Sequence, residues 1–572
     1  METAYNSGLI VEQLKPGMVV KPILWDAYDK VTTSTGATYP QVEKLVKEYQ
    51  TNGALVMNYI GHASEQQVSH EVVLKLVDFK NFTNSRLPLW ITSSCDVAPF
   101  DGLVDNIGEE VVLNKKGGAV AYFGSARTVF IPQNDLINRA FMRFLFTKQN
   151  GRHVTIGEAQ RLTKNYLLNS DRDALLDGTL SGKTKDSSQN KLQYLILGDP
   201  ALHLNIPELD AVVDSINDIP VGGALMPNLK AGGIVTIKGH VEQDGNLLTD
   251  YNGTVTALVR DASEHIVCKM NDPATMSKDT KAFEYDDRTK ILFNGSNVIK
   301  NGEFTIMFAM PKDISYTDQH GKINLFAVNN EKSLCANGAC EDFTIGGSEQ
   351  LSNDSIGPSI YCYLNSRDFV DGGNVNETPY FVAEVSDKDG LNTSGNGIGH
   401  DLELIIDNDM TMTYNLNANF VYDFGSYTTG STHYSLPQLS EGRHSLRFRA
   451  WDILNNSNTA TLNFNVVKGL RPDQLDVTVT NNPARTSTTF IITHDRSGSN
   501  LDVALEIFDM SGRLLYKQEE TGVSTTNTYT IDWDLTTDGG GKLQTGVYLY
   551  RVILGTDGAT RTSKAKKLII IQ

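Results

Sequence analysis

Two short stretches, Gly53-Ala-Leu-Val-Met-Asn-Tyr-Ile-Gly-His62 and Leu87-Pro-Leu-Trp-Ile-Thr-Ser-Ser-Cys95, decide the fold of the first third of the chain. Each contains an apolar run that is too short for a buried helix and is bounded by Gly or Pro, which is typical of a buried strand. The pattern of residues 69–79, with Ser69 as N-cap, predicts a helix between them. Strand, helix and strand form a right-handed crossover between parallel neighbours, so we expect an α/β sheet.

Each predicted strand ends in a residue that can take part in covalent catalysis, His62 or Cys95. The carboxyl ends of parallel strands meet at one edge of the sheet, where open α/β sheets bind ligands. A thiolate is a strong nucleophile, and an imidazole beside a thiol favours the thiolate. The pattern therefore predicts a nucleophile–base pair. A small buried Cys and a structural His are the alternative interpretation.

The sequence around these two residues resembles the gingipain-type cysteine peptidases, whose catalytic domain is caspase-like. The resemblance lies in Asn58-Tyr-Ile-Gly-His62, in Ser93-Ser-Cys95-Asp96 and in Phe100-Asp101, with further similarity at residues 34–40, 87–90 and 197–202. It covers about residues 15–207. Within this family, the similarity is to surface peptidases of the type IX secretion system of Bacteroidetes.

The resemblance implies peptide-bond cleavage through an acyl-enzyme. Cys95 is the expected nucleophile, and His62 is expected to protonate the leaving amine and then to activate water or another amine. The backbone N–H groups of Ala63 and Cys95 are the oxyanion donors that the family implies. Gly usually follows the His in this family, so the oxyanion hole here needs a backbone conformation that Ala63 can adopt.

Further residues are expected near this site. Asp26 is the candidate for orienting His62, with a turn or capping aspartate as the alternative. The expected substrate contacts, with ordinary loop structure as the alternative, are Ser93, Arg127, Thr128 and Phe130. Four acidic residues lie close together in the sequence: Asp101, Asp105, Glu109 and Glu110. They predict a solvated helix start, with calcium binding as the alternative. The sequence has no zinc or phosphate-loop pattern, and we expect no other metal or cofactor.

Composition narrows the class of protein. The chain has 572 residues, of which 40% are hydrophobic and 21% charged, as in a globular protein of several domains. Its net charge of −18 argues against nucleic acid as a partner, because that partner needs a basic surface. Five cysteines are too few for a disulfide scaffold, although the spacing of Cys335 and Cys340 allows one local disulfide.

The pattern of the sequence changes after Pro207. Residues 1–207 alternate helical and buried-strand patterns, as expected of an α/β domain. The later residues alternate with period two between turn clusters, which is typical of β-sandwiches. We expect immunoglobulin-like sandwich modules at residues 208–350, 351–467 and 468–572. The last of these resembles a type IX secretion C-terminal domain, and a generic immunoglobulin-like module is the alternative.

The resemblance implies an exported enzyme at the cell surface, associated with the outer membrane. Its expected substrates are cargo proteins with C-terminal sorting domains, and its expected partners are other outer-membrane components of the secretion system. Lipopolysaccharide is the expected acceptor of released cargo. No apolar run reaches the ~20 residues of a membrane helix. We expect an export signal and the first strands of the sheet upstream of residue 1. The alternative is a catalytically incomplete surface protein whose β-modules bind partners.

Overall fold

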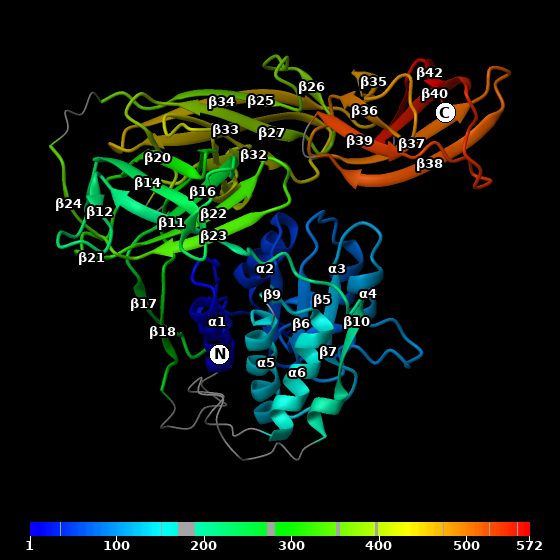
Figure 1. The fold of residues 1–572 in the computed structure, drawn as a ribbon. Helices are drawn as coiled ribbons and strands as arrows, with labels where there is room; N and C mark the ends of the chain where they lie inside the picture. Colours follow the sequence, from blue (N-terminus) through cyan, green and yellow to red (C-terminus); the bar gives the residue numbers. More distant parts are fainter. Residues whose placement is uncertain are drawn as a thin grey trace.

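The computed structural model describes residues 1–34, 36–149, 151–169, 189–271, 281–350, 355–394, 399–472, 474–524, 527–556 and 559–571. The chain folds into an α/β domain followed by three β-modules (Figure 1). Among the described residues beyond Gly198, the only helical segments are the short 3-10 turns Met410–Met412 and Asn417–Asn419. The expected multidomain class, with an α/β domain followed by β-modules, is therefore confirmed.

A four-stranded sheet with the order β10-β7-β6-β3 forms the centre of the α/β domain. Strands β3, β6 and β7 are parallel, and β10 is antiparallel to β7. The strands are β3 (Val56–Ile60), β6 (Leu89–Ser93), β7 (Ala121–Ser125) and β10 (Tyr194–Gly198). The helices are α1 (Glu2–Leu14), α2 (Pro40–Asn52), α3 (Leu76–Asn81), α4 (Ile107–Leu113), α5 (Ile131–Leu145) and α6 (Ile156–Asn169). The shorter elements are η1 (Trp25–Ala27), β1 (Val31–Thr33), β2 (Gly36–Thr38), β4 (Gln67–Val68), β5 (Leu74–Lys75), β8 (Lys148–Gln149), β9 (Arg152–His153) and η2 (Asn190–Gln193).

Helices cover both faces of this sheet. Helices α1, α5 and α6 pack on the face that carries Ile91 and Phe123, whereas α2, α3 and α4 pack on the face that carries Trp90 and Tyr122. Every residue of β6 and β7 is buried, because side chains alternate between two covered faces. This double burial explains why consecutive residues in the first part of each strand are apolar.

Two segments of this domain differ from expectation. The helix expected at residues 69–79 begins only at Leu76, and the residues before it form the β4–β5 hairpin. Ser69 and Val72 have φ angles of 71° and 52°, which a right-handed helix does not allow. The connection still joins two parallel neighbours, as predicted. Helix α1 was not expected from the sequence.

The first β-module is a closed barrel rather than the expected sandwich. Its main sheet runs β11-β23-β22-β16-β19-β20-β14, and β14 also pairs with β11, so the sheet closes on itself. Period-two alternation occurs in both architectures and does not separate them. The strands of this module are β11 (Leu209–Ile216), β12 (Ile219–Pro220), β13 (Asn228–Ala231), β14 (Ile234–Gln243), β15 (Asn246–Leu247), β16 (Gly253–Arg260), β17 (Glu264–Val267), β18 (Glu284–Asp287), β19 (Ile291–Lys300), β20 (Glu303–Ala309), β21 (Gln319–His320), β22 (Lys322–Asn329), β23 (Cys335–Cys340) and β24 (Thr344–Ser348).

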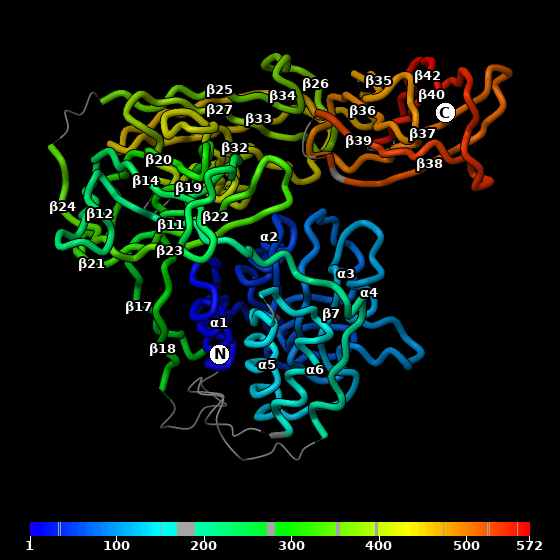
Figure 2. The backbone as a smooth tube through the Cα atoms, viewed as in Figure 1, coloured from blue at the N-terminus to red at the C-terminus, as the bar shows by residue number. Residues whose placement is uncertain are grey.

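The second and third β-modules each consist of two sheets. In the second, the order β25-β27-β32-β31 faces the order β26-β34-β33-β29-β30; its strands are β25 (Ser359–Leu364), β26 (Asn374–Val375), β27 (Tyr380–Ser386), β28 (Leu391–Asn392), β29 (Glu403–Ile406), β30 (Thr413–Asn415), β31 (Val421–Tyr422), β32 (Thr429–Ser435), β33 (Gly442–Asp452) and β34 (Ser457–Val466). In the third, β35-β36-β39 faces β38-β37-β40-β41; its strands are β35 (Leu475–Val479), β36 (Thr488–His494), β37 (Asn500–Phe508), β38 (Leu514–Val523), β39 (Thr528–Trp533), β40 (Gly546–Thr556), β41 (Ala559–Thr562) and β42 (Lys566–Ile570). The third module lies at the far end of the molecule and has a separate core (Figure 2).

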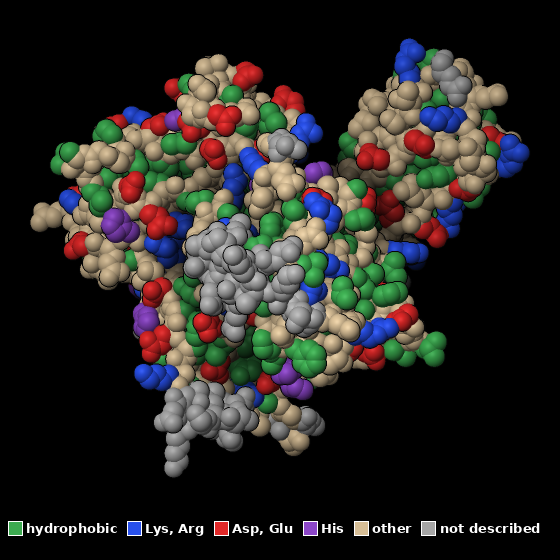
Figure 3. Space-filling model, turned by 60° about the horizontal axis from the view of Figure 1, so that its bottom comes forward, with side chains coloured by type: hydrophobic (Ala, Val, Ile, Leu, Met, Phe, Trp, Pro, Cys, Tyr) green, Lys and Arg blue, Asp and Glu red, His purple; other side chains and the backbone are tan. Residues whose placement is uncertain are grey.

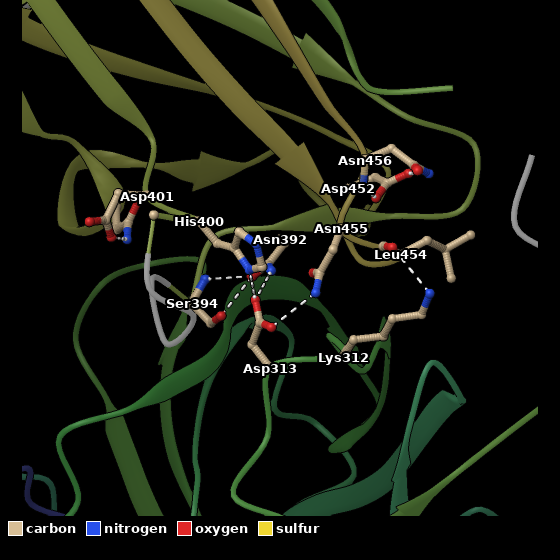
Figure 4. A network of polar contacts seen from close by, with 12 residues as sticks. Lys312, Asp313, Asn392, Ser394, His400, Asp401, Asp452, Leu454, Asn455 and Asn456 are labelled. Carbon is tan, nitrogen blue, oxygen red and sulfur yellow. Dashed lines mark hydrogen bonds and ion pairs between the residues drawn. The ribbon is translucent and has the colours of Figure 1, made fainter. Parts of the chain in front are cut away.

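A polar network joins the barrel to the second module (Figure 4). The carboxylate of Asp313, from the barrel, accepts hydrogen bonds from His400 Nδ1 at 2.7 Å, Asn392 Nδ2 at 2.9 Å and Asn455 Nδ2 at 3.0 Å. One hydrophobic cluster also runs through both modules. The two modules therefore pack against each other and share part of their core.

The structure also bears on the expected disulfide and on membrane-spanning helices. Cys335 and Cys340 are free thiols at opposite ends of β23. Five residue steps along a strand span about 16 Å, far beyond disulfide reach, so the expected local disulfide is wrong. In the described part of the chain, no helix is both long and apolar enough to cross a membrane.

Candidate active site

His62 and Cys95 lie beyond the carboxyl ends of two adjacent parallel strands. In the β3–β6 register, Ile60 is opposite Ser93. His62 and Cys95 each follow two residues after this last pair, so both lie near the same edge of the sheet. The predicted adjacency of the two strands is confirmed. The distance between the two reactive groups stays a prediction, at about 3–7 Å.

The thiol side of the site is held by contacts between two loops. The Cys95 thiol donates to the Val129 carbonyl at 3.2 Å. Asp96 follows with a φ of 50°, and its carboxylate accepts a hydrogen bond from Thr128 Oγ1 at 2.9 Å. The Asp96 N–H donates to the Arg127 carbonyl at 3.3 Å. These contacts hold the loop that carries the thiol. Cys95 is half-buried in it and keeps some exposure to solvent.

Ala63 adopts a backbone conformation outside the left-handed region. It faces Val68 in an isolated antiparallel bridge, in which Ser69 N–H donates to the His62 carbonyl at 2.8 Å. In this type of pair, the hydrogen bonds flank the bridged residues, so the Ala63 N–H points away from Val68. Ala therefore fits the position at which the family usually has Gly.

Two backbone donors at this edge are free. Within the described residues, no hydrogen bond uses the N–H of Ala63 or the N–H of Cys95. Ala63 and Cys95 both follow the carboxyl ends of the adjacent strands β3 and β6, so the two donors lie at the same edge of the sheet. They suit a ligand that carries a negatively charged oxygen, which is the chemistry of an oxyanion hole.

A second histidine lies beside His62. The ring centroids of His62 and His70 are 4.9 Å apart, and both side chains are exposed. His70 belongs to the turn between β4 and β5, where Ser69 and Val72 have positive φ angles. The sequence analysis missed His70, because the helix expected at residues 69–79 would have pointed it elsewhere.

Asp26 has a structural partner other than His62. Its two carboxylate oxygens accept hydrogen bonds from the backbone N–H groups of Met270 at 2.9 Å and Asn271 at 2.8 Å. These residues follow β17 in the hairpin that runs beside α1 (Figure 1). These contacts are those of the alternative interpretation, a capping aspartate, and no hydrogen bond joins Asp26 to His62 among the described residues.

The expected substrate contacts fall into two groups. Ser93 is only 1% exposed, and its hydroxyl accepts a hydrogen bond from Asn138 at 2.9 Å. It therefore packs under α5 and does not present its side chain at the edge, contrary to expectation. Arg127, Thr128 and Phe130 are exposed in the loop that holds the thiol. Arg127 is paired with Asp101 at 2.5 Å.

Apolar side chains are exposed in the same two loops. Phe130 is 64% and Phe100 55% exposed. Leu103, Val104 and Ile131 are also exposed. Figure 3 shows one face of the molecule, on which hydrophobic side chains are exposed among charged ones. A surface of this kind beside a nucleophile is suited to contact with apolar side chains of a polypeptide.

The four acidic residues near the site contact basic side chains or the start of helix α4. Asp105 and Glu110 contact Lys80 at 2.5 and 3.4 Å. Glu109 N–H donates to the N-cap side chain of Asn106, and Asp101 binds Arg127. No cluster of three or more His, Cys, Asp or Glu residues suited to a metal occurs in the described ranges. Calcium binding here stays an untested alternative.

Comparison with known proteins identifies the α/β domain. Residues 2–205 match the family model of peptidase family C25. The α/β domain belongs to peptidase family C25. The matched region ends close to residue 207, where the sequence pattern changes to β. No curated protein matches the chain.

Several solved structures are similar to this chain. Dimeric latent PorU from Porphyromonas gingivalis is 32% identical, with 80% of this chain and 41% of that chain covered and a TM-score of 0.34. The RgpB pro- and mature-domain complex from the same organism is 16% identical, covering 59% and 62%, with a TM-score of 0.27. The Arg-specific cysteine proteinase gingipain R is 16% identical, covering 60% and 62%, with a TM-score of 0.28. The chain thus spans about two fifths of the PorU chain, and at these TM-scores the family assignment rests on the family model.

Proposed function

We propose that this chain is a cysteine endopeptidase that acts through Cys95 and His62. The observation that supports this most directly is the parallel register of β3 and β6, within a domain of peptidase family C25. That register brings a thiol and an imidazole to one sheet edge from residues 33 positions apart (95 − 62). The free N–H groups of Ala63 and Cys95 add an oxyanion site beside them.

The proposed reaction has two steps. The Cys95 thiolate attacks the peptide carbonyl carbon, forming a C–S bond, and the carbonyl oxygen takes up the negative charge at the Ala63 and Cys95 N–H groups. The intermediate collapses, the C–N bond breaks, and His62 transfers a proton to the leaving amine. Water or an amine then attacks the thioester, the C–S bond breaks, and the proton it releases passes to His62.

The cellular role is proposed from the sequence resemblance. We propose that the substrates are cargo proteins with C-terminal sorting domains of the type IX secretion system, cleaved at the cell surface in contact with other outer-membrane components. In a transfer reaction, an amine of lipopolysaccharide would replace water in the second step. The substrate approaches the thiol across the loop of Arg127, Thr128 and Phe130.

Labelling of the full chain with iodoacetamide tests the proposal. Cys95 should be alkylated first, and Cys95→Ala should abolish both this labelling and peptide cleavage. The matched control is Cys335→Ala, because Cys335 is also half-buried but lies in the barrel. His62→Ala should lose as much activity as Cys95→Ala, since residues that act as a unit are not additive. Full cleavage by Cys95→Ala would refute the peptidase and favour a binding scaffold.

A further inference from the structure

The backbone carbonyl of His62 accepts two hydrogen bonds. The Tyr59 hydroxyl donates to it at 2.7 Å, and the Ser69 N–H donates at 2.8 Å. A carbonyl oxygen has two lone pairs, so both are in use. The same peptide unit carries the Ala63 N–H, and in a planar trans peptide the C=O and N–H point in opposite directions. Two donors on the carbonyl therefore fix the direction of the Ala63 N–H.

Tyr59 is itself held in place. Its ring stacks on Trp25 with centroids 5.4 Å apart and an interplanar angle of 28°. Gly61 leaves the space for its hydroxyl, because a Cβ at that position would lie 2.5 Å from the Tyr59 oxygen. Burial raises the pKa of the Tyr59 hydroxyl. The group therefore stays protonated, and remains a donor, throughout the physiological pH range.

We propose that Tyr59 is a positioning residue that holds and polarises the His62–Ala63 peptide as an oxyanion donor. The inference rests on the proposed peptidase function of the same site. Hydrogen bonds in a chain polarise one another, so a donor on the carbonyl strengthens the N–H on the other side of the peptide. Tyr59 and Ser69 thus orient the backbone N–H of Ala63, a position at which the family usually has Gly.

The role predicts a specific kinetic signature. An oxyanion donor acts on the charge that develops in the tetrahedral state, and loss of one such donor costs about 100- to 1000-fold in kcat. Tyr59→Phe keeps the ring on Trp25 and removes only the hydroxyl, so the donor is loosened rather than lost. We expect kcat to fall about 10- to 100-fold while KM changes less than about twofold.

Two measurements on the full chain separate this role from a general loss of structure. The affinity for a peptidyl aldehyde, which forms a tetrahedral adduct with the thiol, should fall by the same factor as kcat. The rate of Cys95 alkylation by iodoacetamide should stay unchanged, because displacement at a saturated carbon creates no oxyanion. Tyr251→Phe is the matched control, since the Tyr251 hydroxyl also donates to a backbone carbonyl, that of Leu334 at 3.0 Å in the barrel.

The outcomes are distinct. Unchanged kcat and aldehyde affinity in an active Tyr59→Phe protein overturn the positioning role and leave the peptidase intact. A parallel fall in alkylation rate and aldehyde affinity also overturns it, because it indicates a disturbed thiol. If Tyr59→Phe fails to fold, Gly61→Ala, which crowds the hydroxyl, should show the same split between aldehyde affinity and alkylation. A wild-type chain that neither cleaves peptide nor reacts at Cys95 overturns the proposed function together with this inference.

Discussion

Asn58 and Asn138 hydrogen-bond to each other through both side-chain amides. Asn138 Nδ2 donates to Asn58 Oδ1 at 2.8 Å, and Asn58 Nδ2 donates to Asn138 Oδ1 at 3.2 Å. The same Asn138 side chain binds Ser93 on β6 and Ser7 on α1. One fully buried amide on α5 therefore ties together both strands that lead to the candidate site.

Asn138→Ala should be strongly destabilising. It leaves the buried hydroxyls of Ser7 and Ser93 and the amide of Asn58 without their partner, and each such loss costs about 1–3 kcal/mol. We expect the free energy of unfolding of the α/β domain to fall by about 3–5 kcal/mol in chemical denaturation. Asn246→Ala, at an exposed position, is the control and should change stability by no more than about 0.5 kcal/mol. A similar loss in both variants would contradict the role of Asn138.

Gly61→Ala should lower both stability and activity. The added Cβ would lie 2.5 Å from the Tyr59 hydroxyl, so the ring must move against Trp25. Overpacking of this kind costs about 1–3 kcal/mol. Thermal melting and peptide cleavage measure the effect. The control is Gly541→Ala, because a Cβ there has no neighbour within 4 Å; equal melting temperatures for the two variants would show that Gly61 is not required.

Phe130→Ala should change substrate binding and leave the fold intact. The side chain is 64% exposed, and its backbone N–H keeps its bond to Asn190 Oδ1 at 2.7 Å. We expect KM for peptide substrates to rise several-fold, with kcat nearly unchanged and stability within about 0.5 kcal/mol. Phe424→Ala, 59% exposed in the second β-module, should leave KM unaltered. An unchanged KM in Phe130→Ala would remove Phe130 from the substrate surface.

Asp26→Ala should release Met270 and Asn271, which follow β17. The carboxylate is the acceptor for the N–H groups of Met270 and Asn271. Amide hydrogen exchange at these two residues should therefore become faster, with a loss of about 1–2 kcal/mol in stability. Asp29→Ala is the control, because Asp29 contacts the neighbouring Lys269 through its side chain, at 2.5 Å, and not through a backbone N–H. Unchanged exchange in Asp26→Ala would mean that the hairpin is held elsewhere.

The third β-module should lose stability in acid through His494. This side chain is fully buried, and burial lowers its pKa from 6.5 to about 4. Between these values the unfolded chain binds a proton that the folded chain does not. The contribution of neutral His494 to the free energy of unfolding is therefore complete above pH 6.5. It is lost as the pH falls toward 4, by at most about 1.4 kcal/mol per pH unit.

His494→Asn provides the comparison for this pH effect. An Asn oxygen can still accept the Arg496 N–H, which now donates to His494 Nδ1 at 3.1 Å, but Asn does not titrate. Denaturant unfolding of the two proteins at pH 7 and pH 4.5 should show a smaller acid loss in the variant. Equal pH dependence in both proteins would assign the acid sensitivity to other groups.

Local patterns in the sequence were sufficient to predict several helices and strands. Helix α2 has bounds that local signals set, because Pro40 occupies its first turn and Gly53, with a φ of 98°, ends it. Strands β3 and β6 were recognisable as short apolar runs between breakers. Their parallel pairing was predicted from the helix expected between them, of which only α3 (Leu76–Asn81) forms. The positions of His62 and Cys95 at one edge depend only on these local signals.

Other features depend on contacts between distant residues, which a local pattern does not contain. Helix α1 has just two buried residues, Ser7 and Val11, and Ser7 is bonded to Asn138, 131 positions away. Asp26 is bound by the hairpin near Asn271, 245 positions away. Barrel and sandwich strands share the same alternation, and only the β11–β14 pairing closes the sheet.

The sequence by itself therefore determined which strands are followed by His62 and Cys95, because strand ends and helix stops are set by neighbouring residues. Tertiary structure alone decided how the reactive edge is held. The turn at Ser69 and Val72 replaces a locally favourable helix because Val68, Val73 and Leu74 gain burial in the core between the sheet and α2. That turn then places a donor, the Ser69 N–H, on the carbonyl of His62.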